Sequence, residues 1–264
     1  MNPIILAVII VAAIGLIAGV GLSIAAMVLA VPVDERVAKV RECLPGANCG
    51  ACGFSGCDGY ANAIVEDGAA LNLCSPGGSD TASAIAGIMG GEAEEISKKT
   101  AVVLCNGNND NCGKKYDYNG VPTCAAVSAL NAGDKNCPYS CLGYGDCARA
   151  CPFNAITICN GVAVIDSEKC TACGACIKTC PRNVIDMMPA NKRKAVTLCS
   201  NQEMGAVSRK QCSVSCIACR LCEKACKFDA IHVVDNRSVV DMEKCVGCGA
   251  CVKVCPTKCL FLRK

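Results

Sequence analysis

A regular pattern of cysteines occurs twice in the second half of the chain. Eight cysteines of the first copy are each followed, 75 residues later, by a cysteine of the second copy. The text between them also matches, because segments 151–170 and 226–245 share an F-x-A-I start and an E-K-C end. Eight matches at one offset exclude chance and indicate an internal duplication. The paired positions are Cys137, Cys141, Cys147, Cys151, Cys170, Cys173, Cys176 and Cys180, followed by Cys212, Cys216, Cys222, Cys226, Cys245, Cys248, Cys251 and Cys255.

Each copy contains a C-x2-C-x2-C-x3-C-P run, from Cys170 to Pro181 and from Cys245 to Pro256. This spacing is typical of bacterial ferredoxins, in which three cysteines hold one [4Fe-4S] cluster and the fourth reaches the neighbouring cluster. Disulfides fit poorly, because thiols so close in sequence cannot all find partners of suitable geometry. Zinc sites usually show one C-x2-C pair and not a triplet. The repeats therefore predict iron–sulfur clusters.

The composition agrees with clusters as part of the core. The 264 residues include 28 Cys and no Trp, and only nine are Phe or Tyr. Free thiolates also indicate a reducing compartment. Residues 1–100 carry five Lys/Arg and ten Asp/Glu. Residues 101–264 carry 21 Lys/Arg and 13 Asp/Glu. Because each cluster adds a charge of about −2, we interpret the basic excess as compensation and expect no nucleic-acid partner.

The N-terminal segment, Met1 to Val33, contains no charged side chain. It is longer than the roughly 20 apolar residues that span a bilayer, which predicts a transmembrane helix. A secretory signal peptide is the alternative, but it would have a basic start and an apolar run of only about 7–15 residues. Arg36, Lys39 and Arg41 follow the segment and nothing basic precedes it. The positive-inside rule therefore predicts a single-pass protein of the cell membrane with its body on the cytoplasmic side.

Residues 34–100 are predicted to form a separate small domain. The text PGANCGACG and the cysteines that follow it supply four candidate cluster ligands, Cys49, Cys52, Cys57 and Cys74. Glycines between them let backbone amides approach the cluster sulfurs. Apolar spacing after Cys57 predicts a helix that covers the site, and a connector helix is expected from about Thr81 to Lys99.

The anchor, the PGANCGACG domain and the ferredoxin repeats together resemble the B subunit of the Rnf complex, the ion-pumping ferredoxin:NAD oxidoreductase of bacteria. The resemblance spans nearly the whole chain, and the four-cysteine domain joined to the anchor is its specific part. Two double-cluster modules, where the shortest members have one, resemble the longer forms of anaerobes. The family implies an electron-transfer subunit that takes electrons from reduced ferredoxin and passes them to the other membrane and flavin-bearing Rnf subunits. The flavin and NAD sites then belong to those subunits.

The first ferredoxin module lacks one cysteine of its front triplet, because Tyr144 stands where the second copy has Cys219. Cys137 is the nearest substitute, so we assign it to the first cluster of that module. The predicted ligand sets are Cys137, Cys141, Cys147 and Cys180; Cys151, Cys170, Cys173 and Cys176; Cys216, Cys219, Cys222 and Cys255; and Cys226, Cys245, Cys248 and Cys251.

Eight cysteines remain without an assignment. Cys43, Cys159 and Cys259 are interpreted as buried thiols or bystanders, and Cys105, Cys112, Cys124, Cys199 and Cys212 lie outside any regular motif. Cys124 falls over Cys199 at the 75-residue offset, yet the text VVLCN at 102–106 resembles VTLCS at 196–200, so two alignments compete. A sixth cluster from Cys105, Cys112, Cys124 and either Cys199 or Cys212 is an open alternative to five clusters.

The sequence as a whole predicts an α+β protein in four parts. These are a transmembrane anchor (1–33), an N-terminal [4Fe-4S] domain with a connector helix (34–100), and two tandem bacterial ferredoxin-like double-cluster modules (101–190 and 191–264). There is no nucleotide loop and no Ser/His/Asp set, so no independent catalytic site is expected. Two alternatives stay open: an Rsx-type subunit that keeps a redox-sensing transcription factor reduced, and a polyferredoxin of another membrane oxidoreductase.

Overall fold

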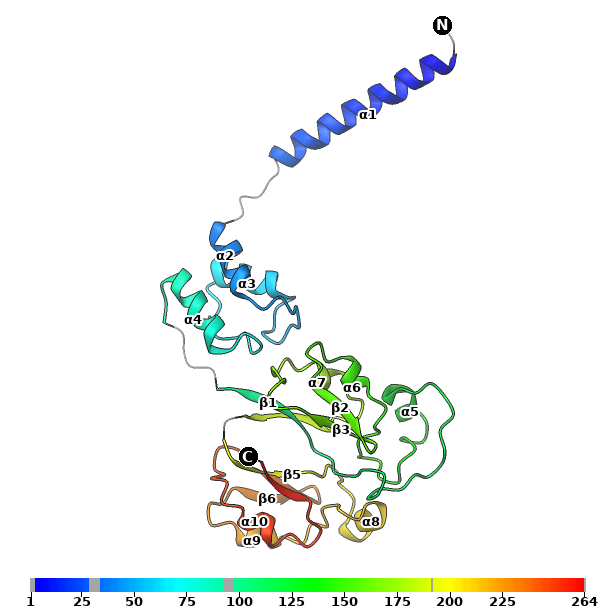
Figure 1. Ribbon diagram of the computed structural model, residues 1–264, viewed down its shortest axis with the longest axis vertical. Coiled ribbons are helices and arrows are strands. Elements are labelled where there is room, and N and C mark those ends of the chain that lie inside the picture. The colour runs from blue at the N-terminus through cyan, green and yellow to red at the C-terminus, as the bar shows by residue number, and fades with distance from the viewer. Residues whose placement is uncertain (1–2, 29–33, 93–96, 191, 264) are drawn as a thin grey trace.

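The computed structural model describes residues 3–28, 34–92, 97–190 and 192–263. Helix α1 (Pro3–Val28) extends away from the rest of the protein (Figure 1). Residues Ile4–Ala25 within it have a mean hydropathy of 3.0, and none of this window is buried against the protein. At 1.5 Å per residue the helix is about 39 Å long, which exceeds the hydrocarbon thickness of a bilayer. Its length and composition are those of a membrane-spanning helix.

The N-terminal domain packs three short helices around a small apolar core (Figure 1). Tyr60 lies at its centre, and its hydroxyl donates to the carbonyl oxygen of Ala70 at 2.7 Å and accepts from the amide of Leu73 at 3.1 Å. These bonds hold the segment that leads to Cys74. The helices are α2 (Glu35–Cys43), α3 (Cys57–Glu66) and α4 (Gly78–Met89).

The connector helix is shorter than the sequence analysis predicts. Helix α4 ends at Met89 because Gly90 adopts a left-handed conformation with φ of 71° and its amide closes the last turn on Ala86. Lys99, the expected end of the helix, is the first residue of a strand. Residues 93–96 of the predicted helix lie outside the described residues.

The first ferredoxin-like module contains two antiparallel pairs of strands with short helices beside them. The first strand of the module pairs with its last strand, and the two strands between them form a hairpin. The pairs are β1 (Lys99–Val103) with β4 (Ile185–Pro189) and β2 (Ile156–Cys159) with β3 (Val162–Ile165). The helices are α5 (Cys124–Ala129), α6 (Asp146–Arg149) and α7 (Ala175–Thr179).

The second module repeats this arrangement, as the duplication predicts. Its first and last strands pair, and a hairpin lies between them. The pairs are β5 (Lys194–Thr197) with β8 (Leu260–Arg263) and β6 (Ile231–Val234) with β7 (Arg237–Val240). The helices are α8 (Gly205–Gln211), α9 (Leu221–Ala225) and α10 (Ala250–Lys253).

The strand pairing decides between the two competing alignments. Strands β1 and β5 occupy the same place in their modules, so Cys105, two residues after β1, corresponds to Cys199, two residues after β5. The hydrogen bonds agree: the Cys141 amide donates to Cys105 Sγ, and the Cys216 amide donates to Cys199 Sγ, both at 3.3 Å. The match of VVLCN with VTLCS is therefore the structural one, and Cys124 belongs to an insertion in the first module.

The two modules lie against each other along the segments that follow β1 and β5 (Figure 1). The amide of Asn106 donates to the Leu198 carbonyl at 3.1 Å, and Ser200 Oγ donates to the Leu104 carbonyl at 2.9 Å. Further along, the Ser213 amide donates to the carbonyl of Asn111 at 2.9 Å. These bonds bring the Cys105 segment and the Cys199 segment side by side.

Candidate metal centres

The N-terminal cysteines lie in a loop whose shape depends on glycine. Gly56 has a φ of 118°, and a Cβ there would lie 3.0 Å from Asn48 Oδ1. That oxygen accepts from the amide of Cys57 at 2.8 Å, at the start of α3. Burial raises the pKa of the Cys74 thiol, and the neighbouring thiols of Cys57, Cys49 and Cys52 raise it further. The four predicted ligands are thus brought together.

The outer set of each module surrounds a small pocket. In the first module Cys151, Cys170, Cys173 and Cys176 line one pocket with Phe153 and Met187. In the second, Cys226, Cys245, Cys248 and Cys251 line the corresponding pocket with Phe228 and Val240. The Cys151 and Cys226 sulfurs each accept a hydrogen bond at 3.4 Å from an amide four residues later. Such bonds to sulfur tune a cluster's reduction potential.

The inner set of the second module gathers beside the β5–β8 pair. Burial raises the pKa of the Cys222 thiol to about 11, with Cys216 and Cys219 among the neighbours that add to the shift. Cys255 completes the predicted set, and its sulfur lies 3.6 Å from that of Cys259. Cys259 is buried and is the fifth thiol of this group.

The inner set of the first module differs from the sequence-based assignment. Burial raises the pKa of the Cys147 thiol to about 12, and the thiols of Cys141, Cys124 and Cys180 are the next three contributions. The thiol of Cys124 therefore lies near those of Cys141, Cys147 and Cys180, and the thiol of Cys137 is not among these neighbours. The structure does not support the grouping of Cys137 with Cys141, Cys147 and Cys180.

Helix α5 brings Cys124 to this place. Thr123 caps the helix by accepting from the amide of Ala126 at 3.2 Å. The amide of Ala125 donates to Asp146 Oδ2 at 3.0 Å, which fixes the start of α5 to the residue before Cys147. The segment 106–136, which is 19 residues longer than its counterpart 200–211, thus places an additional thiol beside the inner set, in which Tyr144 stands at the position of Cys219.

Tyr144 has a structural role of its own. Its hydroxyl donates to Asp134 Oδ2 at 2.9 Å, and its ring packs edge-on against Tyr118 with the ring centroids 6.0 Å apart. Both rings pack against the small cluster of buried residues that contains Cys124. The tyrosine therefore supports the helix that carries the substitute cysteine.

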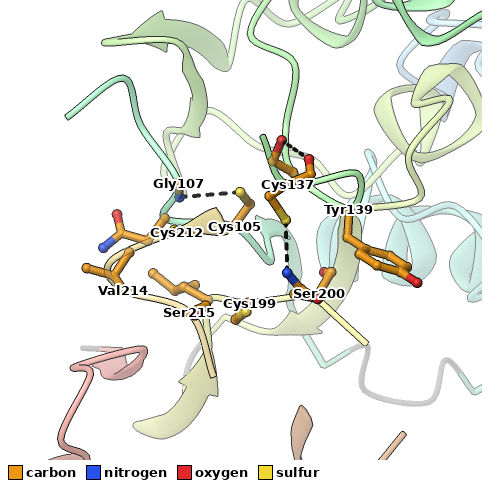
Figure 2. Close-up of a pocket in the computed structure, with 13 residues that line it drawn as sticks. Cys105, Gly107, Cys137, Tyr139, Cys199, Ser200, Cys212, Val214 and Ser215 are labelled. Carbon is orange, nitrogen blue, oxygen red and sulfur yellow. Dashed lines mark hydrogen bonds between the residues drawn. The ribbon is translucent and has the colours of Figure 1, made fainter. Parts of the chain in front are cut away.

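Cys137 lies instead in a pocket at the junction of the two modules, with Cys105, Cys199 and Cys212 (Figure 2). Cys112 is packed against Cys137 and Cys212 in the same buried cluster. Four of these cysteines have no place in the predicted ligand sets, and the open alternative of a sixth cluster grouped Cys105 and Cys112 with Cys124 and either Cys199 or Cys212. The structure differs from that alternative, because Cys137 and not Cys124 lies in this pocket.

The two outer sets and the junction cysteines each surround a pocket. Within residues 3–28, 34–92, 97–190 and 192–263, no three His, Cys, Asp or Glu side chains converge closely enough to hold a single metal ion. A [4Fe-4S] cluster is larger than one ion and is held by four thiolates around its faces. The raised pKa values of the Cys74, Cys147 and Cys222 thiols describe sites in which buried negative charge is unfavourable unless iron offsets it.

Comparisons with known proteins agree with this arrangement. The FeS family model of Fe-S cluster domains matches residues 44–76. The 4Fe-4S binding domain models match residues 163–186 and 238–261, and a second model of that description matches residues 215–229. The B subunit of the Na⁺-translocating ferredoxin:NAD⁺ oxidoreductase complex of Acetobacterium woodii is 43% identical over 98% of this chain and 78% of its own length. The chain belongs to the family of Rnf B subunits.

Other Rnf B subunits support the same assignment. The B subunit of an ion-translocating oxidoreductase complex of Methanosarcina acetivorans is 42% identical over 96% of both chains. The B subunit of the proton-translocating complex of Clostridium ljungdahlii is 38% identical over 97% of this chain and 92% of its own. This Rnf B protein is therefore an iron–sulfur electron-transfer subunit of a membrane-bound, ion-translocating ferredoxin:NAD⁺ oxidoreductase complex, in which it acts with other subunits.

Proposed function

We propose that this subunit carries electrons from reduced ferredoxin to the membrane redox subunits of its complex. The observation that supports this most directly is the continuous series of cysteine sets from the membrane-linked domain to the far module. Burial raises the pKa of the Cys173 thiol, and the thiol of Cys49 is the first neighbouring charge that adds to it. The N-terminal set therefore lies beside the outer set of the first module.

Five sets of cysteines are proposed to hold the clusters. When bound, [4Fe-4S] clusters supply reversible one-electron transfer. The chain positions them in pockets lined by buried thiols and backbone amides. The sets are Cys49, Cys52, Cys57 and Cys74; Cys151, Cys170, Cys173 and Cys176; Cys124, Cys141, Cys147 and Cys180; Cys216, Cys219, Cys222 and Cys255; and Cys226, Cys245, Cys248 and Cys251.

Anaerobic mixing of the oxidised full-length protein with reduced ferredoxin tests this function. We expect rapid bleaching of the visible iron–sulfur absorbance, at a rate proportional to the ferredoxin concentration. A protein that is bleached by dithionite but not by reduced ferredoxin would contradict the proposed donor.

Electron entry is predicted at the basic surface of the second module. Arg220, Lys224 and Lys227 are exposed around α9, close to Cys222 and Cys226. Arg220 lies 3.7 Å from Glu223, an exposed pair that leaves the basic excess in place. Because steering by charge accelerates association, an acidic ferredoxin would be drawn to this surface.

Replacing these three residues by Glu should slow reduction by ferredoxin at low salt and weaken its salt dependence. Reduction by a small artificial donor should stay unchanged. The matched control replaces Lys169 and Lys178 of the first module and Lys192 at the start of the second, all away from α9, by Glu, which alters the total charge equally. Equal slowing by both triple variants would contradict a docking site at α9.

The body of the protein is predicted to face the cytoplasm. Arg36, Lys39 and Arg41 follow α1, and Arg41 is held on the domain surface by Asp58, with 2.6 Å between Nε and Oδ1. Protease added to right-side-out vesicles should leave the ferredoxin-like modules intact, and protease added to inverted vesicles should digest them. The reverse pattern would refute the topology.

A further inference from the structure

A pocket between the two ferredoxin-like modules is lined by four buried thiols that the five sets do not use. Figure 2 shows Cys105 and Cys137 of the first module with Cys199 and Cys212 of the second around this pocket. Each is at most 9% exposed. None of the four is in a disulfide. Four buried thiols from two modules that line one pocket have the arrangement expected of ligands to a shared metal cluster.

The four cysteines form two pairs related by the internal duplication. Cys105 and Cys199 follow β1 and β5, and Cys137 and Cys212 are 75 residues apart like the other repeated cysteines. Each module thus contributes the same two positions. Hydrogen bonds across the junction, such as Asn106 to Leu198, bring the two pairs face to face. The pocket is therefore lined by the same two cysteine positions of each module.

The groups around the pocket suit thiolate ligands. Cys105 Sγ accepts from the amides of Cys141 at 3.3 Å and Gly107 at 3.4 Å, and Cys199 Sγ accepts from the amide of Cys216 at 3.3 Å. Cys137 Sγ accepts from Asn201 Nδ2 at 3.3 Å. Sulfurs of the outer sets receive amide bonds of the same kind, and such bonds stabilise cluster ligands.

Two further features point to a bulky anionic occupant. A Cβ at Gly107 would lie 3.3 Å from Cys112 Cβ, 3.5 Å from Cys105 Sγ and 3.6 Å from Cys212 Sγ, so a side chain at this position would crowd the cysteines on this wall of the pocket. Lys135 is 1% exposed, and its ammonium donates to the carbonyl oxygens of Gly107 at 2.8 Å and Gly161 at 2.7 Å. Carbonyl oxygens do not cancel its charge, whereas a cluster with four thiolates carries about −2.

We propose that Cys105, Cys137, Cys199 and Cys212 hold a sixth [4Fe-4S] cluster at the junction of the two modules. This inference rests on the proposed electron-transfer function, because the site lies between the inner sets of the two modules and would connect them. Cys112 is a fifth buried thiol and is hydrogen-bonded to the thiol of Cys212, but it lies in the longer loop of the first module, has no counterpart in the second module and is not among the residues that line the pocket. It is therefore left out of the ligand set.

Native mass spectrometry with iron and sulfide analysis of the anaerobically purified full-length protein tests the proposal. Six clusters predict about 24 iron atoms per chain, and five predict about 20. The Cys137→Ala/Cys212→Ala variant should contain about four fewer iron atoms than the wild type. Cys112→Ala and Cys159→Ala, the latter at an exposed position of β2, are matched controls and should keep the wild-type content.

A wild-type content of about 20 iron atoms would overturn the sixth site, as would a zinc ion in its place. Loss of four iron atoms in Cys112→Ala would overturn the ligand set. The wild-type count does not depend on the folding of any variant. A protein with about 20 iron atoms that is still reduced by ferredoxin would sink this inference and leave the proposed function standing.

Discussion

Replacing Cys124 by alanine is expected to remove one cluster, or about four iron atoms, from the protein. Cys124 is the thiol that the structure places beside Cys141, Cys147 and Cys180, where Tyr144 occupies the position of the usual fourth ligand. Three thiolates leave one iron of a cubic cluster without a protein ligand. Electron flow through the first module should therefore fall to background, because this set lies between its outer set and the second module.

A second substitution provides a rescue of the same cluster. Tyr144→Cys rebuilds the C-x2-C-x2-C triplet of the second module, so the Cys124→Ala/Tyr144→Cys protein should regain the lost iron. Iron analysis and EPR of the reduced proteins measure both steps. Cys159→Ala is the control for removal of a cysteine as such.

The sequence-based assignment predicts a different result, which makes the experiment decisive. If Cys137 belonged to this set, Cys124→Ala would keep all its iron, and Tyr144→Cys would have nothing to rescue. Loss of the cluster in Cys124→Ala without rescue by Tyr144→Cys would place the fourth ligand at a position other than that of Cys219.

The sequence predicts the fold class and most of the cysteine sets because ferredoxin ligands lie close together along the chain. Cys170, Cys173 and Cys176 share one turn-and-helix segment, so their spacing alone shows that their thiols converge. The same holds in the second module. For these residues, local spacing and three-dimensional position carry the same information.

The cysteine spacing does not identify the fourth ligand of the first module's inner set, because the candidate thiol lies in a loop that is longer than its counterpart in the second module. Cys105 and Cys137 are 32 positions apart, and their counterparts Cys199 and Cys212 are 13 apart, so the constant 75-residue offset breaks down before Cys137. The alignment of Cys124 with Cys199 at the 75-residue offset is a coincidence. The text VVLCN was the signal for the correct alignment, and the strand pairing of β1 with β4 confirms it.

Spacing alone could not define the junction pocket, although the open alternative of a sixth cluster already grouped Cys105 with Cys199 or Cys212. Its four cysteines come in pairs from two modules, and they meet because backbone bonds such as Asn106 to Leu198 dock one module on the other. A duplicated sequence shows that two modules exist, but not which faces they share. The predicted length of the connector helix was wrong for a local reason, since Gly90 ends the helix at Met89.

The second prediction with a large effect concerns the removal of iron. The two ferredoxin-like modules should lose their fold when the clusters are stripped, and the N-terminal helices should keep part of theirs. In the second module six of the ten residues of the buried core are cysteines, and the strands form only two-stranded sheets. Two-stranded sheets are marginal on their own in water.

The N-terminal domain has a different core. Tyr60, Ile64, Ile85 and Val40 are each at most 1% exposed and pack between three helices, with two cysteines among the nine fully buried residues of the cluster. Because burial of each large apolar side chain contributes about 1.5–3 kcal/mol, these helices retain a driving force for packing without iron.

Hydrogen exchange with mass spectrometry, before and after anaerobic chelation of iron, measures the two regions separately. Amides of β5 to β8 should lose their protection completely, as expected when binding of metal and folding are one process. Amides of α2 and α3 should lose only part of theirs. Protection that persists throughout β5–β8 in iron-free protein would show that the polypeptide alone holds the module, and that the cysteines are placed on a preformed scaffold.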